Sequence, residues 1–296
     1  MFKRLSPYFR KAQTKKREIA RVWVIKLPFT QQICEDRLGG ESEVFYLQGG
    51  QRGGGQSHAA RNSEKGVWMR NAVALSNGDF YINIPDIIEN LDILSAMRGP
   101  QELCCDIIEY PELVRTGVDK IDGVYFKYYD GFYNIVKDVD GGNSFTGFNI
   151  LGGGKVAKLQ CDFSAMISPD MFRKYVQPSL RKQCQKLEHS IYHLDGPDAI
   201  KHLDALMEID ELDAVQWQFT CGPGQLDGGD EKWFSIYDKV RKANKGLSIT
   251  LSNGTPDDWT KSAKRIVNRY GMEGIYFLFP EFPDLESACK MAETFG

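Results

Sequence analysis

The sequence predicts an α/β protein, and two observations support this prediction. From residue 156 to the end, short apolar segments alternate with longer segments of helical spacing, in at least five repeats. Capping residues such as Ser, Thr or Asp follow several of the short segments, often beside a proline, and these residues commonly begin a helix. No glycine-rich dinucleotide turn marks the first strand of the series. We therefore expect a (β/α)8 barrel of the TIM type in preference to an open doubly wound sheet.

The composition is that of an ordinary globular protein. Of the 296 residues, 42% are hydrophobic and 26% are charged, and the net charge of −3 argues against a nucleic-acid partner. No apolar run reaches the roughly 20 residues that a membrane-spanning helix needs. The seven cysteines are odd in number and lack C-x-x-C spacing, so we expect a reducing, cytoplasmic location and no disulfide framework.

The chain divides at about residue 75. We expect residues 1–75 to form an atypical N-terminal segment with one strand at 21–27 and a flexible glycine-rich loop at 49–66, where His58 would be exposed. Residues 76–296 are expected to form the barrel domain. It should begin with a strand at 79–84, helices at 86–98, 101–108 and 111 to about 137, and a loop at 140–154.

The β-α series follows in regular order. Strands are expected at 156–163, 190–195, 214–219, 247–251 and 274–279, and helices at 169–188, 198–208, 231–243, from 255 and from 284.

The most informative stretch is 190–196, SIYHLDG. His193 and Asp195 are two residues apart, so on an extended strand their side chains point to the same face. The strand ends at Gly196 and Pro197, and Asp198 can cap the following helix. Ionisable groups at the carboxyl end of a strand commonly carry the chemistry of an α/β protein. We therefore expect His193 and Asp195 to be catalytic.

Other polar or reactive residues lie at the expected strand ends. They are Cys161, Asp162, Trp217, Gln218, Cys221, Ser252, Asn253 and Glu281. A thiolate, an imidazole and carboxylates could hold zinc or another divalent metal, and we assign His193, Asp195, Glu281 and Cys161 to such a site. Tyr192, Trp217, Gln218 and Asp162 are expected to bind substrate. Two alternatives stay open: the same groups could act as general acid and base without metal, or His193 and the cysteines could be ordinary core residues.

Three segments of the sequence resemble a known protein family. Residues 161–183 (CDFSAMISPDMFRKYVQPSLRKQ), 190–217 (SIYHLDGPDAIKHLDALMEI, then LDAVQW) and 91–114 resemble the uroporphyrinogen decarboxylase superfamily. The helix start at Ser168, Pro169 and Phe172, the later Pro178 and the His-x-x-Gly turn are its specific elements. The resemblance covers about residues 78–296, and it implies a (β/α)8 barrel with its active site at the carboxyl ends of the strands.

The superfamily contains the decarboxylase and the cobalamin-linked methyltransferases. The decarboxylase's arginine-rich N-terminal motif has no match in residues 1–75. Thiol methyltransferases of the family hold zinc with a His-x-Cys pair and a later Cys. Here His193 matches the His, Asp195 stands where the Cys would be, and Glu281 lies near the place of the late Cys.

The resemblance therefore implies a methyltransferase that moves a methyl group between a corrinoid and a small substrate. A corrinoid protein or a small methyl donor or acceptor would be its partner, and a homodimer is compatible with it. The alternatives are a cofactor-free decarboxylase and a non-catalytic corrinoid-binding subunit. The family usually has two strands before the 79–84 region, whereas this chain offers one, so we expect an incomplete or atypical N-terminal part of the barrel. An open seam would expose strand edges, which is costly unless they are covered or paired with another subunit.

Overall fold

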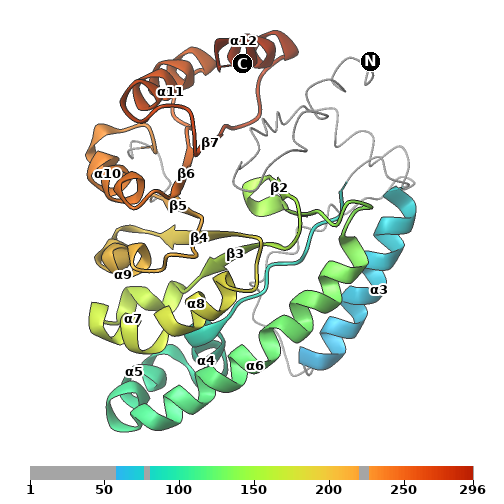
Figure 1. Cartoon of the computed structure of the whole chain (residues 1–296), viewed down its shortest axis with the longest axis vertical. Helices are drawn as coiled ribbons and strands as arrows, with labels where there is room; N and C mark the ends of the chain where they lie inside the picture. The colour runs from blue at the N-terminus through green and yellow to red at the C-terminus, as the bar shows by residue number, and fades with distance from the viewer. Residues whose placement is uncertain (1–57, 77–80, 220–226, 296) are drawn as a thin grey trace.

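The computed structural model of the chain describes residues 58–76, 81–219 and 227–295, and these form an α/β structure (Figure 1). Its centre is a parallel sheet of five strands in the order β3-β4-β5-β6-β7. The strands are β3 (Val156–Gln160), β4 (His189–Asp195), β5 (Ala214–Gln218), β6 (Gly246–Thr250) and β7 (Ile275–Leu278). The expected α/β class and the five strands of the repeating series are confirmed.

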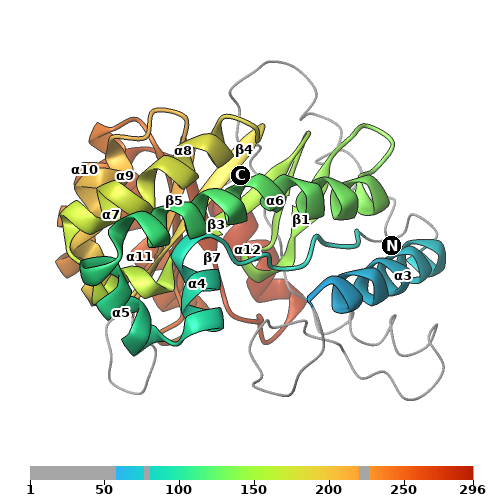
Figure 2. The ribbon, with the colours of Figure 1, turned by 90° about the horizontal axis from the view of Figure 1, so that it is seen from below.

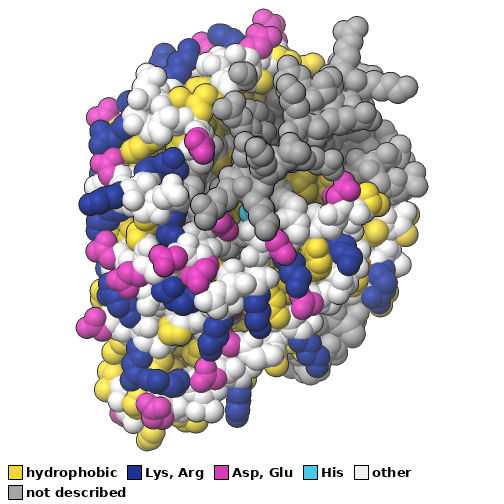
Figure 3. All heavy atoms as spheres, in the orientation of Figure 1, with side chains coloured by type: hydrophobic (Ala, Val, Ile, Leu, Met, Phe, Trp, Pro, Cys, Tyr) yellow, Lys and Arg dark blue, Asp and Glu magenta, His cyan; other side chains and the backbone are white. Residues whose placement is uncertain are grey.

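Helices connect consecutive strands, a last helix follows β7, and together these helices cover one face of the sheet. They are η3 (Asp162–Met166), α7 (Pro169–Tyr175), α8 (Gln177–Cys184), η4 (Pro197–His202), α9 (Leu203–Met207), η5 (Glu231–Trp233), α10 (Phe234–Lys242), α11 (Pro256–Tyr270) and α12 (Leu285–Phe295). Because the strand order follows the chain without reversal, right-handed crossovers place these helices on the same side. Basic and acidic side chains are interspersed over this outer helical surface (Figure 3).

The N-terminal helices pack around the longest of them. They are α3 (His58–Ser76), α4 (Asn90–Arg98), α5 (Pro100–Glu109) and α6 (Pro111–Val136). The aromatic side chains of Tyr125, Tyr129 and Phe132 lie on one side of α6 and are buried in the core. None of the helices in the described ranges combines the length and apolar character needed to cross a membrane.

A short antiparallel hairpin covers the other face of the sheet. It consists of β1 (Asn143–Phe145), η2 (Thr146–Phe148) and β2 (Ile150–Gly152), where we expected only a loop. Phe148 packs against Ile191 of β4 and Ala214 of β5. The Tyr276 hydroxyl of β7 donates a hydrogen bond to the carbonyl of Asn149, at 2.7 Å. We call the two sides of the sheet the hairpin face and the helix face.

Several element boundaries differ from those expected, for identifiable reasons. Residues 58–66, expected in the glycine-rich loop, are helical in α3, and α4 begins at 90 instead of 86. The single helix expected at 169–188 divides at Val176, because Pro178 has no N–H to continue the helical pattern and its ring crowds the carbonyl of Lys174. The helix expected at 198–208 begins with the 3-10 turn η4, and β3 ends at Gln160.

The strand expected at 79–84 is absent over residues 81–84, the part of it that is described. The segment makes one ladder-like contact, from the amide of Ile84 to the carbonyl of Ser144 at 3.3 Å. The strand expected at 21–27, the loop at 49–57 and Cys221 lie outside the described residues. In the described chain β3 and β7 each pair with one strand, so no closed barrel is detected.

At the edge of β3 that faces away from β4, side chains form hydrogen bonds with the backbone of Val156 and Gln160. Asn143 bonds both backbone groups of Val156: its Nδ2 donates to the carbonyl at 3.1 Å, and its Oδ1 accepts from the amide at 2.8 Å. At the other end of the strand, the Gln160 amide donates to Glu89 Oε1 at 2.7 Å and its carbonyl accepts from Asn90 Nδ2 at 3.1 Å. An unpaired strand edge is costly when buried, and these contacts supply the partners that a neighbouring strand would supply.

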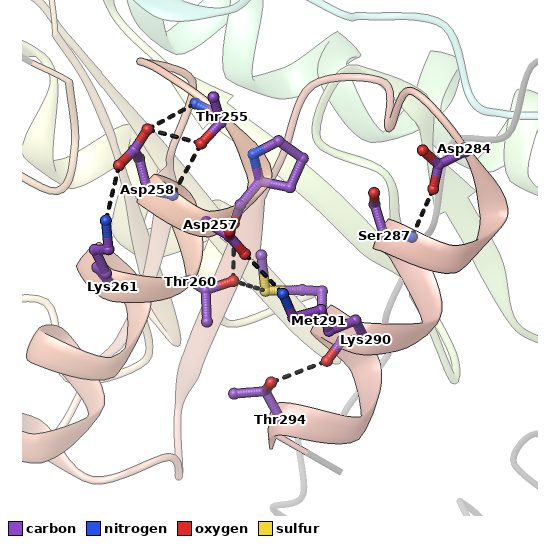
Figure 4. A network of polar contacts seen from close by, with 11 residues as sticks. Thr255, Asp257, Asp258, Thr260, Lys261, Asp284, Ser287, Lys290, Met291 and Thr294 are labelled. Carbon is purple, nitrogen blue, oxygen red and sulfur yellow. Dashed lines mark hydrogen bonds and ion pairs between the residues drawn. The ribbon is translucent and has the colours of Figure 1, made fainter.

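The last two helices are fixed by polar contacts (Figure 4). Thr255 and Asp258 form a capping box at the start of α11, as the Thr-Pro-Asp-Asp sequence predicts. Lys290 of α12 forms an ion pair with Asp257 at 3.0 Å, and the Thr260 hydroxyl contacts the Met291 sulfur at 3.5 Å. These contacts join α12 to α11.

Replacing Asn143 tests the edge capping. We expect Asn143→Ala to lower the free energy of unfolding by about 1–3 kcal/mol, because it leaves the buried Val156 amide without a partner. Tyr129→Phe is the matched control, since the Tyr129 hydroxyl donates to the same Val156 carbonyl, which keeps its bond from Asn143. Chemical denaturation should show the smaller loss for Tyr129→Phe. An equal or larger loss there would contradict the capping role of Asn143.

Candidate functional site

A row of polar side chains crosses the hairpin face of the sheet. The strand register pairs Gln160 with His193, His193 with Gln216, Gln216 with Ser248 and Ser248 with Tyr276. His193 lies on the hairpin face, because its ring centre is 5.3 Å from that of Phe148. Since side chains directly opposite in a sheet share a face, the whole row lies there. One residue from each of the five strands contributes to it.

The amide of Gln216 sets the orientation of the His193 ring. Gln216 Nε2 lies 3.2 Å from the backbone carbonyl of Trp217 and 3.1 Å from Gln218 Oε1. A backbone carbonyl only accepts, so the amide nitrogen must face it, and Gln216 Oε1 then faces His193 Nδ1. Nδ1 therefore carries the proton of the neutral ring. This leaves a lone pair on Nε2.

Asp195 lies next to this free nitrogen. Its Oδ1 is 4.0 Å from His193 Nε2, and its side chain is 48% exposed against 18% for the histidine. Burial lowers the pKa of His193, and the bond from Gln216 and the charge of Asp195 oppose that shift. The ring is therefore neutral at pH 7 and can accept a proton at Nε2, where Asp195 would stabilise the resulting imidazolium.

Carboxylates gather at the carboxyl end of β3. Asp92 of α4 accepts from the amides of Asp162 and Phe163, at 3.0 and 2.8 Å. Gln160 Nε2 donates to both Asp92 and Asp162, at 3.2 and 3.1 Å. Partial loss of hydration, together with the charges of Asp92 and Asp195, raises the pKa of Asp162 to about 6. Asp162 can therefore exchange a proton near neutral pH.

A buried lysine, Lys158, lies on the same face of the sheet as His193, two residues before Gln160 on β3. Lys158 Nζ forms an ion pair with Asp86 at 2.6 Å and contacts the Gln160 side chain, and its side chain is 3% exposed. Sequence reasoning missed Lys158, Asp86, Asp92 and Gln216. The alternation of Lys158 and Gln160 with Ala157 and Leu159 could have indicated a polar face on β3, whereas nothing local to Asp92 points to the site.

Three of the predicted site residues lie on the helix face. Tyr192, Trp217 and Cys161 are at most 3% exposed and belong to the main apolar core. Strand alternation forces this, because Tyr192 and Trp217 are each one residue from a member of the polar row. Burial raises the pKa of Cys161 well above its usual range, which disfavours a thiolate. None of the three lines the hairpin face beside His193.

The remaining predicted residues lie near the strand ends. Gln218 is on the hairpin face opposite Asp195 in the register. The amides of Ser252 and Asn253 both donate to Asp227 Oδ2 at 3.1 Å, so Asp227 fixes the loop after β6. Glu281 is exposed in the segment after β7.

The predicted metal ligands do not assemble. Over the described ranges, no three His, Cys, Asp or Glu side chains are grouped so that they could hold a metal ion. His193 and Asp195 lie close together, whereas Cys161 is on the opposite face of the sheet. The described residues therefore do not form the zinc site predicted from the sequence.

The pKa of Asp162 predicts a pH-dependent stability. Above pH 3.8 the unfolded chain releases this proton while the folded chain holds it until about pH 6, so stability falls as the pH rises through this window. The shift corresponds to at most about 3 kcal/mol. Solvent screening at this partly exposed side chain reduces the effect to about 1 kcal/mol.

We therefore expect Asp162→Asn to stabilise the protein by about 1 kcal/mol at pH 7.5 and by less at pH 4.5. Urea unfolding at both pH values measures the difference. Asp170→Asn, on an exposed residue at the start of α7, is the matched control and should show no such trend. If the stability gained in Asp162→Asn instead increased toward low pH, the raised pKa of Asp162 would be contradicted.

Replacing Gln216 should lower the pKa of His193 further. The bond from Gln216 raises the His193 pKa, so Gln216→Met removes a contribution that stabilises the charged ring. An NMR titration of the histidine ring protons measures it. Ser248→Ala, which alters the neighbour of Gln216 in the row, should leave the His193 pKa unchanged. A His193 pKa that rises in Gln216→Met would contradict this geometry.

No protein-family model matches the chain, and the search of curated proteins finds no match to it.

Proposed function

We propose that the chain is a methyltransferase of the uroporphyrinogen decarboxylase superfamily, which moves a methyl group between a corrinoid carrier and a small substrate. The reaction would take place at the carboxyl ends of β3, β4 and β5. The geometry of His193 supports this proposal best: its imidazole is neutral, and the Nε2 lone pair lies beside Asp195 at the end of a strand. The resemblance of residues 161–183 and 190–217 to the family supplies the reaction class.

We also propose that the five-stranded sheet is part of a (β/α)8 barrel. Its order follows the chain from β3 to β7 without reversal, whereas a doubly wound sheet would contain a reversal. The connecting helices cover one face only, and the polar row lies on the other (Figure 1). Inward-facing polar residues near the strand ends are typical of the active side of such barrels.

In this proposal His193 is the general base for the methyl acceptor. Its Nε2 takes the proton from an O–H, N–H or S–H group as that atom forms its new bond to the methyl carbon, and the bond from this carbon to the methyl donor breaks with its electron pair left on the donor. Asp195 stabilises the imidazolium, and Gln216 holds Nδ1–H in place throughout. A base at this position replaces the acceptor activation that zinc supplies in thiol methyltransferases.

A corrinoid, when bound, would supply the methyl group or accept it. Met166 ends η3, directly after β3, and its side chain is 53% exposed. Its apolar surface suits contact with a flat corrin ring brought by a carrier protein. Because the described residues do not fit the zinc set, the proposed step uses no metal.

The charge of the site weighs against the decarboxylase alternative. A polycarboxylate substrate needs cationic partners, whereas Asp92, Asp162 and Asp195 gather at this end of the sheet. The cation beside them, Lys158, is already paired with Asp86. A neutral or cationic methyl acceptor is compatible with these charges.

The direct test is methyl transfer from methylcobalamin to a panel of small thiols, amines and alcohols, followed by the visible spectrum of the corrinoid. We expect turnover with at least one acceptor, and a rate about 10²–10⁴-fold lower in His193→Ala, the usual effect of losing a general base. His189→Ala is the matched control, because His189 lies at the opposite end of the same strand. It should retain the wild-type rate.

Two results would refute the proposal. Corrinoid binding without turnover by any acceptor would favour a non-catalytic partner subunit, and release of carbon dioxide from uroporphyrinogen would favour the decarboxylase. Full activity in His193→Ala would remove the histidine from the mechanism while leaving the family assignment untouched.

A further inference from the structure

The hairpin places an aromatic ring against His193. Phe148 lies at the end of η2 and is buried, and its ring centre is 5.3 Å from that of His193, with the two ring planes inclined by 43°. A side chain on a strand stands away from its sheet, so its neighbours in the sheet flank it and a second layer has to cover it. The hairpin is such a layer for His193, and it lies across the sheet from α7, α9 and α10 (Figure 1, Figure 2).

Several features fix the position of Phe148. It packs against β4 and β5, and its ring meets the ring of Phe145 edge on, with the centres 5.5 Å apart. The following residue, Asn149, has a φ of 51°, a left-handed conformation that asparagine adopts more readily than most residues. The hydroxyl of Tyr276 on β7 donates its 2.7 Å hydrogen bond to the Asn149 carbonyl. Phe148 is therefore held both by the sheet and by the turn that follows it.

The hairpin adds no charge to this environment, because residues 143–152 contain no ionisable side chain. Phe148 belongs to the apolar surface that buries the His193 ring, and burial is the main cause that lowers the pKa of this histidine. The ionisable groups that face the ring or the hairpin come from the other elements. They are Asp195 of β4, Lys158 of β3, Asp86 of the segment before α4 and Tyr276 of β7, and Asp162 interacts with Asp195.

We propose that Phe148 is a positioning residue for the reaction that acts through His193: it covers the imidazole and keeps water from it, so that the neutral base is preserved. This role rests on the proposed function, in which His193 is the base. It gives the hairpin a part in the reaction, in addition to covering the sheet. Without Phe148, water would reach the ring and hydrate the imidazolium, and less of the neutral base would remain at a given pH.

An aromatic ring can also favour a charged imidazole, because the electron-rich face of the ring attracts a cation placed over it. The planes of Phe148 and His193 are inclined by 43°, so the two rings neither stack in parallel nor meet edge to face. This geometry weakens the attraction, and we expect the loss of hydration to dominate. The two effects predict opposite shifts of the His193 pKa when Phe148 is removed, so an experiment can separate them.

An NMR titration of the histidine ring protons in Phe148→Ala tests the role. We expect the His193 pKa to be higher in the variant than in the wild-type protein, because the imidazolium gains hydration. Phe148→Leu, a smaller truncation, should raise the pKa by less, and it serves if Phe148→Ala does not fold. An unchanged or lower His193 pKa in the folded variant would overturn the assignment.

Phe132→Leu is the matched control for Phe148→Leu. Phe132 is a buried phenylalanine of α6 in the main apolar core, so the same exchange there lowers stability without uncovering His193. The His193 pKa of this control should equal that of the wild-type protein. An equal rise in Phe132→Leu would mean a general loosening of the fold and would refute a specific role of Phe148.

The pH dependence of methyl transfer separates this role from the proposed function. If both are correct, the rate of Phe148→Ala declines at a higher pH than the wild-type rate as the solution is acidified, because a base with a raised pKa is protonated earlier. A raised His193 pKa without turnover by either protein would support the role of Phe148 as a cover and refute the methyltransferase. Turnover with superimposable pH profiles would refute the role of Phe148 alone.

Discussion

Strand alternation is the constraint on which the rest of this structure depends. Each residue of the parallel sheet must send its side chain either to the helices or to the hairpin. Leu159, Trp217 and Ile249 take the helix face and form the apolar core with the surrounding helices. Their neighbours in sequence then have to face the hairpin, and Gln160, Gln216 and Ser248 are among these neighbours. The same register that builds the core thus assembles the site.

The edge of β3 shows how an interrupted sheet can be stable. A strand ladder needs a partner for each backbone group, and β3 obtains partners at both its ends from Asn143, Glu89 and Asn90. Asn90 is held at a φ of 44°, a left-handed conformation that asparagine tolerates better than most residues. The side-chain caps also have a consequence for the site, because Glu89, Asn90 and Asp92 fix the end of β3 where Gln160 and Asp162 lie.

Local patterns were enough to predict much of the fold. Five strands, the long helix α6 and the start of α11 follow from apolar spacing and capping residues. The sequence could not show that residues 81–84 lack strand pairing, because the edge they would join is satisfied by side chains distant in the chain. The break at Val176 follows from the known effect of Pro178 within a helix, so the sequence alone contains the signal for it.

The candidate site was predicted less completely. The spacing of His193 and Asp195 placed them correctly on one face, whereas Tyr192, Trp217 and Cys161 were selected by residue type without regard to alternation. Asp92 reaches the site from a helix 70 residues away from Asp162, a contact that no local pattern encodes.

The protonation of His193 tests the central claim most directly. In the protein labelled with ¹⁵N-histidine at pH 7, we expect a neutral His193 with the proton on Nδ1 and no proton on Nε2. Nitrogen chemical shifts distinguish the two ring atoms, and a His193→Gln variant assigns the signals. A proton on Nε2, or a ring charged at pH 7, would contradict the proposed base.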